Sequence, residues 1–261
     1  MNRASQSLNS QFPVRILLPL VLLLLVGMLF LGALVLLLLL PSSAHARISS
    51  LLASLLATDS TQAWWYVTRA AGLTAYLLMW LSMVWGLAVS SRILHPLVEG
   101  SYSYDFHEFL SLLGLGFVLL HAGVLLFDRY VPYTLVQLLI PFLGAYRPFW
   151  VGIGILGFYI LVLVTVTFYL KPIIGVSLFR GIHVLSLLGY LGVTLHGLFA
   201  GTDSALAMTK AVYACTALLV VFMTGYWLVL RWLTKREKFT AEPPAHPASR
   251  QPQPLPLPGR R

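Results

Sequence analysis

The chain has 261 residues, of which 59% are hydrophobic and only 10% are charged. So few charges cannot cover the surface of a soluble domain of this length, which excludes an ordinary soluble globular protein. The formal net charge is +9. The basic residues lie at the ends of apolar runs and in a C-terminal tail, which argues against a nucleic-acid partner and for signals of membrane topology. We therefore expect an all-α, polytopic membrane helical bundle with six transmembrane helices, surrounded by lipid.

Residues 1–63 are predicted to form an N-terminal transmembrane helix and a connector. The first apolar run, Val14–Leu40, has 27 residues, whereas the hydrophobic part of a signal peptide has about 7–15. We interpret it as the first span, although Pro41–Ala46 offers a weak cleavage-like sequence and removal of the run is the alternative. The spacing of apolar residues in Ile48–Leu56 predicts a short helix at the membrane interface.

Residues 64–234 are predicted to form the functional domain. The remaining five spans are expected at about 64–90, 106–127, 149–170, 181–200 and 206–233, because a helix needs about 20 apolar residues to cross a bilayer. The half-apolar loop Asp128–Pro148 is expected to lie on the membrane surface as a lid. Residues 235–261 are basic and proline-rich, which predicts a disordered cytoplasmic tail.

The distribution of lysine and arginine predicts the topology. With six spans, the side that carries both termini holds 12 of the 17 basic residues. The positive-inside rule then places both termini in the cytoplasm. In this arrangement the third span (106–127) and the fifth (181–200) run in the same direction, from inside to outside.

Four of the seven histidines lie in these two parallel spans, where ionisable residues are rare and usually functional. His107 and His183 each begin a span, and His121 and His196 each lie seven residues before an aspartate. The depths match, so we expect an inner and an outer pair about 20 Å apart. The other three histidines lie in loops or the tail and are interpreted as solvated: His45, His95 and His246.

Paired imidazoles favour haem over other metal centres. Imidazole is a common axial ligand of haem iron, and two of them leave no open position, which favours one-electron transfer. A zinc site is a poorer interpretation because no second histidine or carboxylate follows at helical spacing. The 14 residues from His107 to His121 return to within about 40° of one helix face, but the 13 from His183 to His196 miss it by about 140°. The fifth span is therefore expected to distort, or its two haems to approach it from different sides, with Gly189 and Gly192 as places for bending or close approach.

The spacing His-x13-His and His-x12-His in two parallel spans resembles the ferric reductase-like transmembrane domain family. Three short segments also resemble family sequences: Arg69-Ala-Ala-Gly72-Leu73, Ser90-Ser-Arg92 and Tyr146-Arg-Pro-Phe-Trp150. The resemblance covers roughly residues 64–232. The family includes NADPH oxidases and the haem-binding membrane subunit of methionine sulfoxide reductase. The chain resembles a bacterial member, which implies the inner membrane of a bacterial cell.

The resemblance implies two b-type haems, an inner one on His107 and His183 and an outer one on His121 and His196. It further implies an oxidoreductase component that passes electrons to an outer acceptor. No FAD or NADPH domain is recognised after Leu233, so a separate cytoplasmic flavoprotein or a quinol is the expected donor. The alternatives are a quinol-linked membrane anchor of a soluble extracytoplasmic oxidoreductase and a non-catalytic haem-binding sensor.

Several weaker signals accompany the histidines. Arg69 and Arg180 are candidate partners of the haem propionates, and each is equally suited to anchor its helix at the interface. The G-x-G-x-x-G of residues 152–157 lies inside a span, so we interpret it as a site of close helix packing rather than a dinucleotide fingerprint. The single cysteine, Cys215, is interpreted as a small buried hydrophobic residue.

Overall fold

The computed structural model describes residues 41–56, 59, 62–93 and 100–240, and this part of the chain is helical and contains no strand. The all-α prediction is confirmed. Five helical segments are long and apolar enough to cross a membrane: Ala63–Ser90, Ser101–Phe127, Pro148–Ile174, Val176–Ala200 and Ala207–Arg236. They correspond to the five expected spans after the first. The expected first span, Val14–Leu40, lies outside the described residues.

The helix boundaries differ from the expected ones mainly in length. Helix α2 spans Ser42–Leu55 and includes most of the predicted short helix. Helix α3 spans Ala63–Ser90, and α4 spans Gly100–Val124 and continues into the 3-10 turn η1, Leu125–Phe127. Helix α9 spans Ala207–Thr240, so residues 235–240 continue a helix where a disordered tail was expected. Residues 241–261 lie outside the described part.

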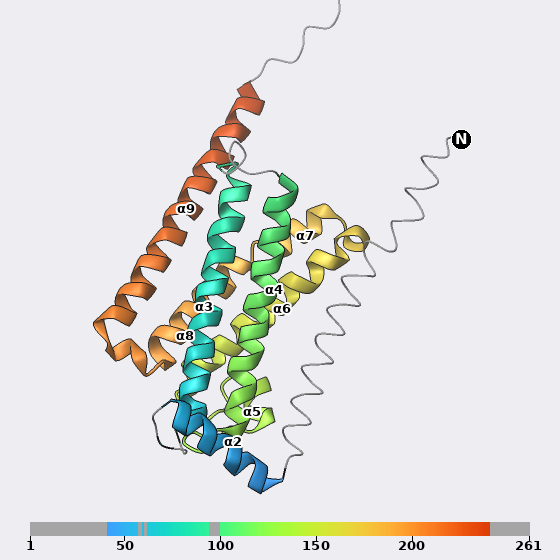
Figure 1. Cartoon of the computed structure of the whole chain (residues 1–261). Helices are drawn as coiled ribbons and strands as arrows, with labels where there is room; N and C mark the ends of the chain where they lie inside the picture. Colours follow the sequence, from blue (N-terminus) through green and yellow to red (C-terminus); the bar gives the residue numbers. More distant parts are fainter. Residues whose placement is uncertain (1–40, 57–58, 60–61, 94–99, 241–261) are drawn as a thin grey trace, which may run out of the picture.

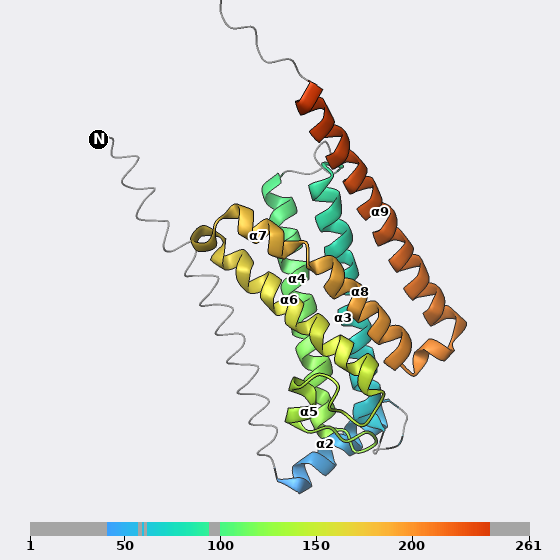
Figure 2. The same ribbon diagram turned by 180° about the vertical axis from the view of Figure 1, so that it is seen from behind.

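The bundle is built from two helix pairs. Helix α3 packs along α4, and α6 (Pro148–Ile174) packs along α8 (Ser186–Ala200). Figures 1 and 2 show the second pair inclined across the first, with α9 along the outside next to α3. Buried residues of α3, α8 and α9 form the core between them: Tyr76, Leu87, Ala88, Tyr190, Tyr213, Val220 and Met223.

Two of the short helices lie at one end of the bundle. Helix α2 and helix α5, Leu135–Leu139, lie near the start of α3 and the end of α4 (Figure 1). Helix α5 is the helical part of the loop that was expected to act as a lid. Its start is fixed by a capping box, in which Thr134 and Gln137 each satisfy a backbone N–H of the other.

The fifth span is distorted, which is one of the two outcomes that its histidine spacing allowed. Helix α7, Val176–His183, ends at the histidine, and Val184 and Leu185 form a turn before α8 begins. The break is not at the glycines. A Cβ atom on Gly189 would lie 3.1 Å from Ile160, so this glycine allows α8 to approach α6 closely.

Two side chains differ from their expected surroundings. Cys215 is exposed on the surface of α9, so the interpretation as a buried hydrophobic residue is wrong. The apolar run around Cys215 had suggested burial, but a helix at the edge of a membrane bundle presents apolar residues outward as well. His45 is only partly exposed and stacks on Phe127 with ring centroids 5.8 Å apart. His95 and His246 lie outside the described residues.

Candidate functional site

The structure brings the four membrane histidines together in two pairs. The ring centroids of His107 on α4 and His183 on α7 are 6.0 Å apart, with an interplanar angle of 71°. Those of His121 on α4 and His196 on α8 are 6.1 Å apart, at 79°. These are the histidine pairs that the parallel direction of the two spans predicted. That these histidines bind a metal stays a prediction.

His121 is held by α3 at two points. Its Nδ1 lies 2.8 Å from the carbonyl oxygen of Thr68, and a carbonyl can only accept, so Nδ1 carries the proton. The edge of the ring lies against Gly72, where an added Cβ would be 2.7 Å from Nδ1. Since Nδ1 donates, the lone pair of this imidazole is on Nε2, the nitrogen left free to bind a ligand.

His196 is held by α6 in the same manner. Its Nδ1 lies 3.0 Å from the carbonyl oxygen of Trp150 and donates to it. The ring lies against Gly154, where an added Cβ would be 2.5 Å from Nδ1. The carbonyl again fixes the proton on Nδ1 and leaves the lone pair on Nε2.

His107 has a hydroxyl partner in place of a carbonyl. Its Nδ1 lies 3.2 Å from the Oγ of Ser82, which also forms a 2.7 Å hydrogen bond with the Oγ of Ser111. The ring lies against Gly86, where an added Cβ would be 2.9 Å from Cε1. Ser111 in turn donates to the carbonyl of His107, so this ring belongs to a small hydroxyl network between α3 and α4.

His183 is the exception among the four. Its Nδ1 is buried and has no hydrogen-bond partner among the described residues. Its ring contacts Phe179, one turn earlier on α7, with centroids 5.2 Å apart. It lies at the last position of α7, next to the break in the span.

Two cavities adjoin the histidine pairs. The inner cavity has a volume of about 170 Å³ and is lined by both His107 and His183. The outer cavity, of about 640 Å³, is lined by His121 and His196 and reaches Leu138 of α5. Most of both linings is apolar, as an apolar macrocycle would require.

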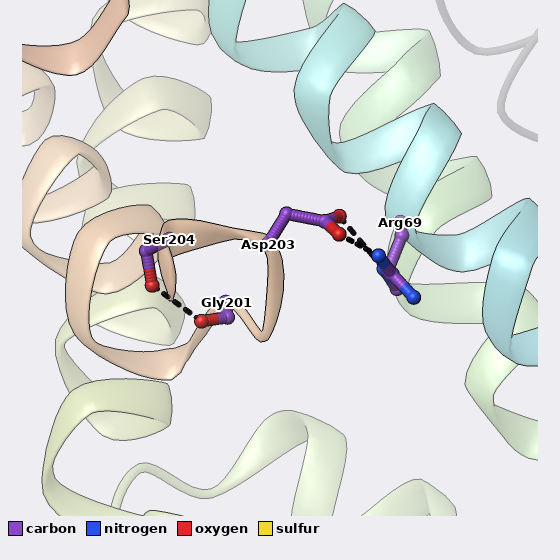
Figure 3. A network of polar contacts seen from close by, with 4 residues as sticks. All are labelled: Arg69, Gly201, Asp203 and Ser204. Atoms are coloured by element: carbon purple, nitrogen blue, oxygen red, sulfur yellow. Dashed lines mark hydrogen bonds and ion pairs between the residues drawn. The ribbon is translucent and has the colours of Figure 1, made fainter. Parts of the chain in front are cut away.

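The two arginines proposed for the propionates have different surroundings. Arg69 lines the outer cavity, and its Nε donates to the Oδ2 of Asp203 at 2.7 Å. Figure 3 shows Arg69 reaching from α3 to this aspartate on the turn after α8. Arg180 is exposed and does not line the inner cavity. Neither arrangement tests the propionate prediction.

Clusters that would hold a bare metal ion are not found. Within the described residues no group of three or more histidine, cysteine, aspartate or glutamate side chains is arranged to bind a metal. Glu108 beside His107 accepts a hydrogen bond of 2.6 Å from Tyr169, so its carboxylate is committed elsewhere. A two-histidine site suits a metal whose remaining ligands come from a cofactor.

The glycines and their neighbouring acceptors are the functional residues that sequence reasoning missed. Gly72 and Gly86 are 14 residues apart, the same spacing as His107 and His121. This match could have indicated from the sequence that α3 packs against the two histidines. Gly154 was interpreted as part of a helix-packing sequence. It does pack closely, but against a histidine ring.

Comparison with known proteins gives no relative. No protein-family model matches this chain, no curated protein matches it, and no solved structure matches it.

Proposed function

We propose that this protein transfers electrons across a membrane through two b-type haems, one held by His107 and His183 and the other by His121 and His196. The main support for the proposal is the distance between the two ring centroids in each pair. Histidine nitrogens bind metal ions at about 2.0–2.1 Å, so two rings about 6 Å apart would leave room for one ion between their nitrogens. The two pairs have separations of 6.0 and 6.1 Å.

The orientation of the imidazoles supports the same proposal. His121 and His196 each donate from Nδ1 to a carbonyl oxygen, which leaves Nε2 as the binding nitrogen. Metal-ligating histidines characteristically donate their other N–H in this way. A haem held by two imidazoles would supply reversible one-electron transfer.

The residues of the protein would then bind the haems, orient them and surround them with apolar side chains. The histidines would hold the two haems at different depths, in cavities whose walls are mostly apolar. On the proposed topology, a cytoplasmic flavoprotein delivers electrons to the inner pair, and an acceptor outside takes them from the outer pair. The chain then acts as an electron-transfer subunit of the ferric reductase type.

A second candidate is a quinol-linked anchor. The outer cavity is favourable for it, because the cavity is far larger than the inner one and its walls include Leu135, Leu138 and Leu139 of α5. A lipophilic quinol suits such a lining, and Arg69 and Asp203 at the same cavity offer polar partners. Haem reduction by a short-chain quinol, but not by a flavoprotein, would favour this candidate.

Transfer across a vesicle membrane tests the proposal. Purified protein is reconstituted into liposomes with ferricyanide trapped inside, and dithionite is added outside. We expect the trapped acceptor to be reduced much faster than in protein-free liposomes, and His121→Ala to abolish the difference. Equal rates with and without protein contradict electron transfer, and bound haem without transfer would point to a sensor.

A further inference from the structure

Three of the four histidines share one holding arrangement. An acceptor on the neighbouring helix receives or shares the Nδ1 proton, and a glycine four residues later on that helix makes room for the ring. The acceptor–glycine pairs are Thr68 with Gly72, Ser82 with Gly86, and Trp150 with Gly154. Residues four apart lie on one helix face, so each pair forms a single contact surface for one imidazole.

The two halves of this arrangement restrict different motions. The hydrogen bond fixes which nitrogen carries the proton and limits rotation about the Cβ–Cγ bond. The glycine allows the ring to lie directly on the helix backbone, where any side chain would collide with it. A ring restrained in both ways is already oriented before a ligand binds, which lowers the entropy lost on binding.

His183 lacks both restraints. The positions on α6 that are 14 residues, or about four helix turns, beyond Trp150 and Gly154 carry Val164 and Phe168. The Phe168 ring contacts Phe179, which contacts His183. Aromatic side chains therefore lie beside His183, whereas a glycine of α3 lies beside His107. The turn at Val184 and Leu185 also separates His183 from the continuous helix α8.

We propose that the three acceptor–glycine pairs are positioning sites for histidine ligands, and that His183, which has none, makes the inner centre the more weakly bound of the two. This inference rests on the proposed function, since it needs a haem at each pair. It assigns a role to Thr68, Ser82 and Trp150 and to the three glycines. None of these six residues is itself proposed as a ligand.

Haem release to excess apomyoglobin tests the inference. We expect two phases of similar amplitude, with the faster about tenfold or more above the slower, in line with the usual cost of losing a hydrogen bond to a metal-bound histidine. His183→Ala should keep only the slow phase, and His196→Ala only the fast phase. A fast phase that persists in His183→Ala, or equal rates for both haems, contradicts the inference.

Glycine variants test the positioning sites directly. Gly72→Ala and Gly154→Ala should each speed release of the outer haem by about tenfold or more and alter its low-spin electron paramagnetic resonance signal, while the inner signal stays unchanged. Gly116→Ala on α4 and Gly181→Ala on α7 are matched controls, because an added Cβ meets nothing within 4 Å at either position. Release that is unchanged in Gly72→Ala and Gly154→Ala contradicts the role of the glycines.

The outcomes separate the two proposals. A purified wild-type protein that binds no haem refutes the proposed function, and the inference falls with it. A protein that binds two haems but releases them at one rate leaves the proposed function intact and refutes the inference alone.

Discussion

The hydroxyl groups of Tyr76 and Tyr190 lie 3.0 Å apart at the centre of the bundle. Tyr76 on α3 lines the outer cavity and Tyr190 on α8 lines the inner one, so the walls of the two cavities meet at this contact. The Oγ1 of Thr216 on α9 lies 2.5 Å from the Tyr76 hydroxyl. Three helices are therefore joined by one buried hydroxyl network.

Removing the Tyr76 hydroxyl should destabilise the bundle. Tyr76→Phe removes the hydrogen bonds to Tyr190 and Thr216, and one intramolecular hydrogen bond contributes about 0.5–1.5 kcal/mol. Thermal unfolding in detergent is the measurement, with Tyr226→Phe as the control because Tyr226 is 42% exposed. Equal melting temperatures for Tyr76→Phe and wild type would show that the network adds no stability.

The ion pair of Arg69 and Asp203 should contribute little to stability (Figure 3). The two side chains are 27% and 37% exposed, and partly exposed pairs contribute about 0–1 kcal/mol. Arg69→Ala and Asp203→Asn should therefore unfold at nearly the wild-type temperature.

The same two variants test the propionate prediction. If Arg69 binds a haem carboxylate, Arg69→Ala should release the outer haem about tenfold faster. This is the lower end of the usual loss of affinity when a supporting contact around a metal site is removed. Asp203→Asn should retain the haem, because Arg69 is still present. Matching release rates in the two variants would count against a propionate role for Arg69.

Asp128 should make the protein less stable as the pH rises. Burial raises the pKa of this carboxyl above its ordinary value of 3.8, although it accepts hydrogen bonds from backbone N–H groups. The folded state therefore binds the proton more tightly than the unfolded state. The resulting stability is present below pH 3.8 and is lost as the pH rises through the raised pKa.

Asp128→Asn tests this pH dependence. The amide keeps an oxygen for the N–H of Tyr130 and carries no charge to bury, so the variant should be more stable than wild type at about pH 7 and similar at about pH 4. Melting curves at both pH values give the answer, and a variant less stable at neutral pH would contradict it.

Ser82→Ala should raise the reduction potential of the inner haem. The Ser82 hydroxyl is the partner of the His107 Nδ1, and a hydrogen bond at this nitrogen makes the imidazole a stronger donor, which stabilises oxidised iron. The expected shift corresponds to about 0.5–1.5 kcal/mol, the net worth of one hydrogen bond. Spectroscopic redox titration should show the outer haem unchanged, and a downward shift of the inner haem would refute the assignment.

The sequence was most informative about what lies within single helices. Runs of apolar residues located the five spans, because length and hydropathy are local properties. The paired depths of His107 with His183 and His121 with His196 followed from parallel direction and helical rise alone. The thirteen-residue gap pointed to a distortion or to haems on different sides of the span, and the helix is distorted at Val184 and Leu185.

Contacts between helices were less predictable. Whether Gly154 faces a histidine or another small residue depends on how α6 is rotated against α8, and no local pattern fixes that rotation. The pairing of Arg69 with Asp203 joins residues 134 positions apart, and the sequence offered each a separate explanation. The outward position of Cys215 was missed because a helix facing lipid carries apolar residues on its outer side too.

Haem content per polypeptide is the most direct test of the central claim. The purified wild-type protein and the four single variants His107→Ala, His121→Ala, His183→Ala and His196→Ala are measured by pyridine haemochrome absorbance. We predict about two b-type haems in the wild type, with six-coordinate spectra as expected for paired imidazole ligands, and about one in each variant. A wild type without haem, or variants that all keep two, would contradict the claim.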